Sequence, residues 1–217
     1  MTDIEIIQIC TEEVEQKSWG ITEQFLDIHS LVYEAGKLKI ERIDRDKRDG
    51  ILIAYISVKD ERFYLAIYVK ANPKPEIVGV GTEPYHSVYF RVTSETLDFD
   101  QLSCLTKLKP TGGWNKGDMR KYGKGEYNFT SLEFLPNPEP DEFDDKLENL
   151  LDFLEQDEEG IKKLVEMAGG YIQVAMFFHN GNTMLGGPHL SKNAIKRMNA
   201  LNLEIDFDLY ANGKYFK

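Results

Sequence analysis

Five short apolar segments between residues 37 and 92 limit the fold of this chain more than any other feature of its sequence. They span residues 37–44, 51–58, 63–69, 77–80 and 87–92, with short polar links such as Lys59-Asp60-Glu61 between them. Strands joined by links this short predict an antiparallel meander. Because the second and third segments are apolar at consecutive positions, we expect this sheet to be covered on both faces.

Helical spacing of apolar residues flanks that region. A helix is predicted over residues 22–35, where Thr22 can cap the first turn and Gly36 follows the last. A shorter helix is predicted over residues 97–105, with Thr93-Ser94 as its cap.

An acidic amphipathic helix is predicted to open near Asp141. Its apolar residues share an arc of roughly 100° and are Phe143, Leu147, Leu150, Leu151 and Leu154. The other side of the helix carries Asp144, Asp145, Glu148, Asp152 and Glu155. The acids at 157–159 would oppose the dipole at the end of a continuous helix but favour the start of a new one. We therefore expect a break near residues 156–160.

The end of the chain has the clearest local pattern. Four apolar residues alternate strictly with polar ones, namely Leu203, Ile205, Phe207 and Leu209 with Glu204, Asp206, Asp208 and Tyr210. This alternation predicts a strand with one dry and one acidic face. A strand over residues 171–178, a tight hairpin turn at Asn180-Gly181 and a helix capped by Ser191 are predicted before it.

These elements together predict an α+β fold with mainly antiparallel sheets and packed helices. An N-terminal part, residues 1–84, would hold a helix and the antiparallel meander. A C-terminal α+β domain, residues 85–217, would follow in the order strand, helix, strand.

The C-terminal part resembles the bacterial family called domain of unknown function 4279. The resemblance rests on the strand ending in Thr93-Ser94-Glu95, the segment 114–118, the helix 147–154, and the closing helix that leads from Leu190-Ser191 into the strand 203–210. It covers roughly the last 60% of the chain and implies an α+β bacterial domain. The family implies no catalytic residues, and the first 84 residues lie outside the resemblance.

The charge of the chain is concentrated in one segment. Ten of the eleven net negative charges lie in residues 139–159, which hold eleven Asp and Glu residues and one lysine, Lys146. The rest of the 217 residues contain 26 acidic and 25 basic side chains. Since duplex nucleic acid and anionic membranes are polyanions, we expect neither to be the main partner. A concentrated acidic surface suits rapid capture of a basic protein.

We therefore expect a non-enzymatic bacterial protein that binds a basic protein partner. Small bacterial immunity proteins cover the nucleic-acid-binding cleft of basic toxin domains with carboxylates, and this chain is analogous in charge and size. An immunity protein against a cognate toxin is thus the specific form of the expectation. A solvated helix face and a protected edge strand would explain the same acids without a partner. The candidate partner-binding residues are Asp144, Asp145, Glu148, Asp152, Glu155, Glu204, Asp206 and Asp208.

The alternative expectation is a regulatory domain that binds a small ligand or a phosphate at the segment 112–118. There, backbone amides and Lys116 could face an anion beside Trp114. The segment lacks the spacing of a phosphate-binding P-loop and the hydroxyl after the lysine. Turns around a packed Trp114 explain the same residues.

Four histidines, His29, His86, His179 and His189, are candidate ligands or bases. None forms a helical His-x-x-x-His pair, and two cysteines are too few for a structural zinc set. Convergence of His179, His189 and Asp206 would give a metal-binding or hydrolytic site, although turn and core histidines are far commoner. No catalytic residue, metal or cofactor is therefore predicted.

The expected location is the cytoplasm. Cys10 and Cys104 are far apart and belong to no paired motif, which is typical of a reducing compartment. The first five residues carry acids where a secretory signal needs basic residues. The longest uncharged run, residues 167–191, is interrupted by a polar turn and by Gly-Gly-Pro, so it does not predict a membrane span.

Overall fold

The structure is a computed structural model that describes residues 1–45, 50–182 and 185–215. Its helices are α1 (Asp3–Gln16), α2 (Gly20–Leu26), α3 (Phe99–Ser103), α4 (Phe143–Leu154), α5 (Glu158–Ala168) and α6 (Lys192–Ala200), with a 3₁₀ turn η2 (Glu155–Asp157). Its strands are β1 (Tyr33–Glu34), β2 (Lys37–Leu38), β3 (Ile40–Asp44), β4 (Ile51–Ser57), β5 (Phe63–Lys70), β6 (Glu76–Ser94), β7 (Gly112–Trp114), β8 (Thr130–Phe134), β9 (Gly170–His179) and β10 (Glu204–Asn212). The predicted α+β class is confirmed.

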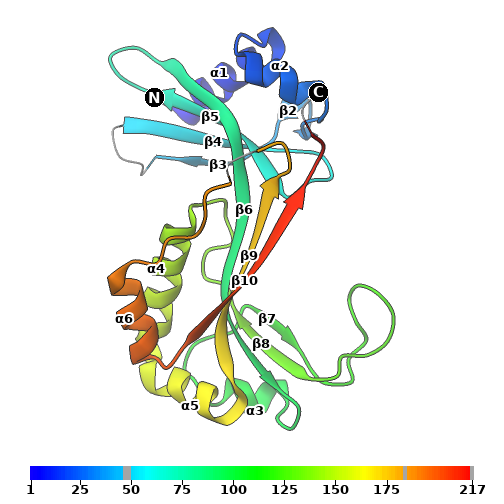
Figure 1. The fold of residues 1–217 in the computed structure, drawn as a ribbon, viewed down its shortest axis with the longest axis vertical. Coiled ribbons are helices and arrows are strands. Elements are labelled where there is room, and N and C mark those ends of the chain that lie inside the picture. Colours follow the sequence, from blue (N-terminus) through cyan, green and yellow to red (C-terminus); the bar gives the residue numbers. More distant parts are fainter. Residues whose placement is uncertain (46–49, 183–184, 216–217) are drawn as a thin grey trace.

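One long strand, β6, connects the two halves of the main sheet (Figure 1). The sheet order is β10-β9-β6-β5-β4-β3, with β8 paired to β6 and β7 paired to β8. From Glu76 to Pro84, β6 pairs with β5, and from Tyr85 onward it pairs with β9. The strands predicted at 77–80 and 87–92 are therefore one strand. Pro84 lies where the partner changes, a place where a missing N–H costs little.

The N-terminal half is a meander packed under two helices. Strands β4 and β5 are buried on both faces, as predicted. One face packs against Ile6, Cys10 and Val14 of α1 and Phe25 of α2, and the other forms a smaller cluster around Tyr55. Helix α1 is not among the elements predicted from the sequence.

A capping box begins α1. The Thr2 hydroxyl accepts a hydrogen bond from the Glu5 N–H, and the Glu5 carboxylate accepts one from the Thr2 N–H. The sequence signal for this helix was present, since a Thr-x-x-Glu pattern precedes apolar residues at helical spacing.

The helix predicted over residues 22–35 is wrong beyond Leu26. The chain after α2 is extended: Leu31 forms a β-bridge with Val58, and the Val32 N–H donates to the Ser57 carbonyl. Gly36 belongs to the turn of the β1–β2 hairpin, where Ala35 has φ 49° and Gly36 has φ 76°. Hydrogen bonds to β4 satisfy the backbone groups of this segment while its apolar side chains are buried beside the sheet. Together these outweigh the local helical spacing.

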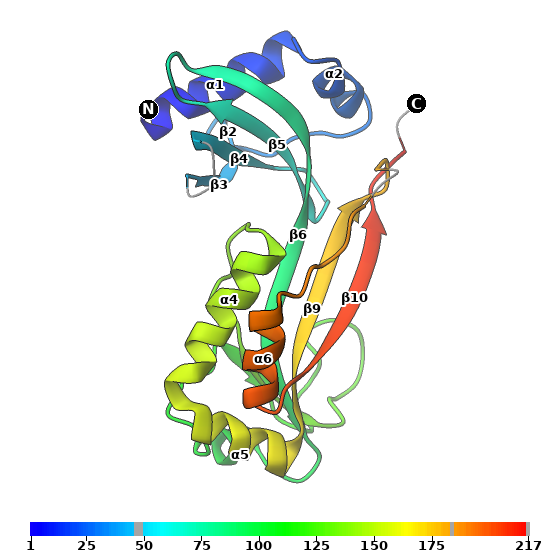
Figure 2. The ribbon, with the colours of Figure 1, turned by 60° about the vertical axis from the view of Figure 1, so that its left-hand side comes forward.

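The C-terminal half is a sheet with helices on one face (Figure 2). Helices α4, α5 and α6 pack their apolar residues on β6, β9 and β10 in a second core. The predicted break between the acidic helix and its successor is confirmed, because η2 separates α4 from α5 and the Asp157 carboxylate accepts the Gly160 N–H. The helix predicted at 97–105 is the shorter α3, which Asp98 caps in place of Thr93-Ser94.

The closing strand β10 is confirmed, but the predicted hairpin before it is wrong. Asn180-Gly181 lies in a turn, yet the chain then leads to α6 and returns so that β10 pairs with β9 in parallel. Because α6 buries Ala194 and Met198 in the core beneath the sheet, the chain crosses back before the next strand. A parallel neighbour requires such a crossover.

Both cysteines are free thiols, with Cys10 buried and Cys104 exposed. Among the described residues, no helix has both the length and the apolar character needed to cross a membrane.

Candidate partner-binding surfaces

The acidic residues of α4 face away from the core, as the helical spacing predicts. Leu147, Leu150 and Leu154 are buried, whereas Asp144, Asp145 and Asp152 are exposed. Asp144 and Asp145 lie in the first turn of the helix, where carboxylates interact favourably with the helix dipole. The one lysine of the acidic segment does not neutralise this surface, because its side chain points inward and is buried.

Two carboxylates of α4 and one of η2 meet one arginine of the neighbouring helix α6. Arg197 lies 2.6 Å from Glu148, 2.5 Å from Asp152 and 2.7 Å from Glu155. These three acids therefore have a structural role in joining α4 to α6. The group of four side chains keeps a net charge of −2, so the helix pair remains acidic.

Replacing Arg197 with glutamine is expected to lower the free energy of unfolding by about 1 kcal/mol. The side chains of Asp152 and Glu148 are 69% and 44% exposed, and ion pairs this exposed contribute little, although the three carboxylates would then repel one another. Urea unfolding measures the loss, with Lys196→Gln on the same helix as the control. A loss of 3 kcal/mol or more would contradict a surface role for Arg197.

The three acids of β10 lie on the opposite side of the sheet from α4. The side chains of Ile205 and Phe207 point to the helices, and the Phe207 ring centre is 5.8 Å from that of Phe143. Since side chains alternate along a strand, Glu204, Asp206 and Asp208 point to the other face. The eight predicted residues therefore form two separate acidic surfaces.

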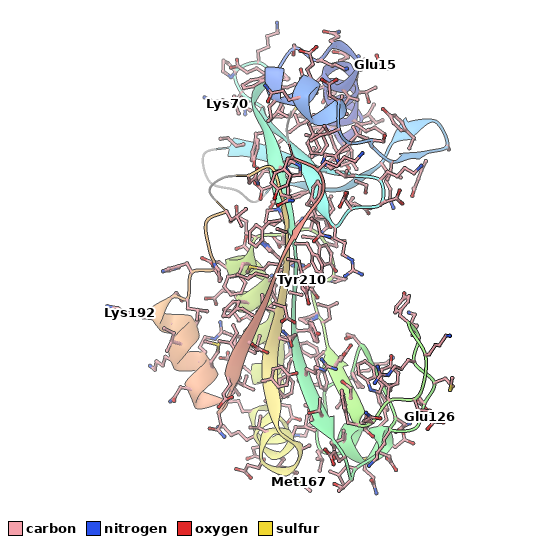
Figure 3. The ribbon with its side chains drawn as sticks, turned by 45° about the vertical axis from the view of Figure 1, so that its right-hand side comes forward. Glu15, Lys70, Glu126, Met167, Lys192 and Tyr210 are labelled. Atoms are coloured by element: carbon pink, nitrogen blue, oxygen red, sulfur yellow. The ribbon has the colours of Figure 1, made fainter. Side chains whose placement is uncertain are left out.

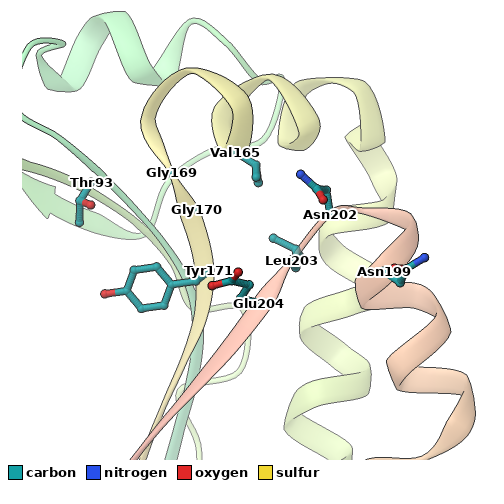
Figure 4. A pocket seen from close by; sticks show the side chains of 9 residues that line it. All are labelled: Thr93, Val165, Gly169, Gly170, Tyr171, Asn199, Asn202, Leu203 and Glu204. Carbon is teal, nitrogen blue, oxygen red and sulfur yellow. The ribbon is translucent and has the colours of Figure 1, made fainter.

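Glu204 lies in a surface pocket at the beginning of β10 (Figure 4). The close-up shows its side chain beside that of Tyr171, its cross-strand neighbour on β9. Thr93, Asn199 and Asn202 complete the polar part of the lining, and the cavity volume is about 580 Å³. The pocket contains one ionisable carboxylate and no buried charge, so it offers polar contacts without an evident acid–base pair.

The hydrogen-bonding groups of the segment 115–118 are engaged within the protein. The Lys116 amine donates to the Glu95 carbonyl, and the Lys116 N–H donates to the Thr130 hydroxyl. The N–H groups of Asn115 and Gly117 donate to the Asp118 carboxylate and the Tyr127 carbonyl. An anion would have to displace these partners, so the geometry gives the phosphate alternative no support.

Trp114 is packed against its neighbours, as expected if this segment consists of turns around a packed tryptophan. Its ring stacks on Tyr127 with centroids 4.3 Å apart, and its indole N–H donates to the Phe129 carbonyl. The Arg91 guanidinium lies 5.2 Å from the centre of the ring. Stacking and a satisfied N–H are what a half-buried tryptophan requires for stability.

The structure pairs His179 with His29 and not with His189. The Nε2 atoms of His179 and His29 are 3.0 Å apart, and both rings are buried beside Phe25 and Phe63. His189 lies instead near Asp144, at 3.7 Å. Desolvation by burial is the main cause that lowers the pKa of both His29 and His179. Among the described residues, no three His, Cys, Asp or Glu side chains are placed to hold a metal ion.

A largely buried ionic cluster joins the N-terminal meander to the segment before α4. We call it the Arg42 cluster: Arg42, Asp44, His86, Asp141 and Lys146. Arg42 lies 2.7 Å from Asp141 and 3.7 Å from Asp44, and it also donates to the Pro140 carbonyl. His86 donates from Nδ1 to the Asp141 carbonyl at 3.1 Å.

Lys146 is the inward-facing lysine of the acidic segment. Its side chain is 1% exposed, and its amine donates to the carbonyls of Asn137 and Glu139. Burial lowers the pKa of Lys146 to about 8. The sequence carries little sign of this cluster, because its members are distant in sequence and each is common on protein surfaces.

The comparisons with known proteins concern the C-terminal part. No curated protein and no solved structure matches the chain. The family described as "Domain of unknown function (DUF4279)" matches residues 83–212, which run from the middle of β6 to the end of β10. This match covers more than half of the chain and confirms the resemblance drawn from the short motifs. The chain therefore belongs to the DUF4279 family.

Proposed function

We propose that this chain is a non-enzymatic, cytoplasmic protein that captures a basic protein partner through the outer surface of α4. The supporting observation is the local excess of negative charge. The segment 139–159 has eleven carboxylates, of which only Asp141 and Asp157 are buried; its one lysine is buried, and Arg197 compensates only part of the charge. A surface of this kind attracts a basic protein and accelerates encounter.

Neutralisation of a cognate toxin is the specific form of the proposal. A toxin domain that binds nucleic acid presents a basic cleft, and carboxylates held on one rigid helix could cover it. The helix is fixed to the body by Leu147, Leu150 and Leu154, so the exposed acids are presented without a loss of backbone conformational entropy on binding.

Charge reversal on α4 is expected to slow association with the partner by about tenfold or more at low salt, with less effect on dissociation. The variant is Asp144→Lys, Asp145→Lys and Asp152→Lys. Its fold should be retained, because exposed ion pairs contribute only about 0–1 kcal/mol each. The measurement is a stopped-flow association rate over a salt series. The partner is to be recovered from native cells, with the product of the adjacent gene as the first protein tested.

A matched control separates local charge from total charge. Glu15→Lys, Glu23→Lys and Asp27→Lys make the same change in net charge at exposed positions of α1, α2 and the end of α2. This control should keep most of the association rate. Equal rates for the wild-type protein and the α4 variant would leave α4 as an ordinary solvated helix face.

A further inference from the structure

The sheet face opposite the helices carries a second set of polar and aromatic residues. Cross-strand registers place Arg91, Tyr171 and Glu204 in one row, and Tyr89, Gln173 and Asp206 in the next. Figures 1 and 2 show α4, α5 and α6 together on the other side of these strands. Glu204, Asp206 and Asp208 are the last residues of three such cross-strand rows, because β10 is the edge strand.

Strand β10 is the last strand of the sheet order and pairs with β9 along one edge. It is nine residues long, and Leu209 and Tyr210 are 59% and 45% exposed. Figure 3 shows Tyr210 on this strand, over the middle of the molecule. The outer edge of a terminal strand can accept a further strand through backbone hydrogen bonds.

Two of the three carboxylates on this edge strand make hydrogen bonds. The Asp208 carboxylate accepts from the Gln173 amide at 3.3 Å, and the Asp206 carboxylate accepts from the Phe207 N–H at 3.0 Å, a bond at the outer edge that an added strand would have to replace. Alternate residues on a strand are about 6.6 Å apart. Glu204, Asp206 and Asp208 thus form a regular acidic row with the spacing of alternate residues in an extended chain.

A second copy of this chain that pairs through the middle of this strand would bring like charges together. In a two-fold antiparallel pairing centred on Phe207, Asp206 of each copy would lie opposite Asp208 of the other. A pairing centred on Asp206 would place that residue opposite itself and Glu204 opposite Asp208. Like charges directly opposite one another destabilise a strand pair.

We infer that the outer edge of β10 binds an extended segment of the basic partner, which adds one strand to the sheet. The segment would carry Lys or Arg at alternate positions, opposite Glu204, Asp206 and Asp208. Its intervening residues would be apolar, beside Phe207 and the exposed Leu209. This inference rests on the proposed function for the identity of the partner, but it concerns a surface separate from α4.

The test uses two synthetic peptides of the same composition. In the first, lysine alternates with valine over seven residues, and in the second the lysines form one block. Fluorescence anisotropy of the labelled peptides is expected to show about tenfold tighter binding of the alternating peptide, since only that order places three lysines opposite three acids. Equal affinities for the two peptides would overturn the inference.

Two neutralised variants locate the site. Glu204→Gln, Asp206→Asn and Asp208→Asn should weaken binding of the alternating peptide about tenfold. Asp144→Asn, Asp145→Asn and Asp152→Asn on α4 make the same change in net charge and should alter affinity by less than about twofold, because those residues lie on the other side of the sheet and salt screens the distance. A larger effect of the α4 variant would overturn the inference.

Backbone methylation distinguishes strand addition from charge attraction. The amides of an added strand face the sheet edge at alternate residues only. Methylating the lysine amides or the valine amides of the alternating peptide should therefore abolish binding in one case and preserve it in the other. Equal binding of the two methylated peptides would refute strand addition.

The outcomes also separate this inference from the proposed function. Peptide binding at β10 with an unchanged partner association rate in the α4 reversal would reject the α4 surface alone. Slower partner association in the α4 reversal, together with equal affinities for the two peptides, would reject the β10 edge alone.

Discussion

Replacing Arg42 with methionine is expected to lower the free energy of unfolding by about 3–5 kcal/mol, because it removes the guanidinium that pairs with two buried carboxylates. The side chains of Asp44 and Asp141 are 1% and 5% exposed, so they have little contact with water to compensate for the lost guanidinium. The Pro140 carbonyl would lose its donor as well. Urea unfolding followed by circular dichroism measures the loss.

The loss should be recovered in part when the carboxylates are removed too. Adding Asp44→Asn and Asp141→Asn to Arg42→Met removes the uncompensated charges, and at least about half of the lost stability should return. Arg45→Met is the matched control, since Arg45 pairs with Asp3 at the surface and should contribute at most about 1 kcal/mol. Similar losses in Arg42→Met and Arg45→Met would contradict the role of the Arg42 cluster.

Replacing His179 with alanine is expected to destabilise the protein by about 2–4 kcal/mol. The substitution removes a buried ring packed against Phe25 and Phe63 and takes away the partner of the His29 Nε2 atom. His189→Ala is the control, because the His189 side chain is 75% exposed. Chemical unfolding at pH 7.5 measures both losses, and equal small losses would contradict a buried histidine pair.

The same pair predicts an acid-sensitive stability. Burial lowers the pKa of His29 and His179 in the folded state, while an unfolded histidine titrates near pH 6.5. Between these values the unfolded chain binds more protons, so the free energy of unfolding rises with pH. The stabilisation is therefore complete above about pH 6.5 and is lost as the pH falls through the folded-state pKa.

The double variant His29→Gln and His179→Gln should reduce this pH dependence between about pH 5 and 7.5. A residual slope is expected from His86, whose pKa is also lowered by burial. Unfolding free energies at several pH values test this, and a wild-type slope in the double variant would contradict the assignment.

The elements that are predicted correctly from the sequence have a regular spacing of apolar residues, and this spacing determines which side is buried. In α4, the spacing of Phe143, Leu150 and Leu154 fixes which side is buried, whatever the helix packs on. In β10, the alternation around Phe207 fixes which side chains face the core. These patterns survive folding because burial of apolar area is the dominant favourable contribution to stability and depends little on direction.

The candidate site could be predicted only in part. Helical spacing correctly indicated that Asp144, Asp145 and Asp152 would be exposed. It could not show that Arg197 would compensate Asp152 and Glu155, because α6 approaches α4 only after the chain has crossed the sheet. Nor could it show that the β10 acids lie on the opposite side of the sheet, which depends on how β10 and α4 share one core.

The sequence by itself determined the fold class, the family, the faces of α4 and β10, and the position of the acidic charge, since each depends on residues close together in the chain. Only the tertiary structure decided that β6 is one strand, that β10 runs parallel to β9, and that the acids form two surfaces. The same holds for the pairing of His29 with His179 and for the Arg42 cluster. These features join residues far apart in sequence, and their contacts exist only after packing has paid the entropy of closing the loops between them.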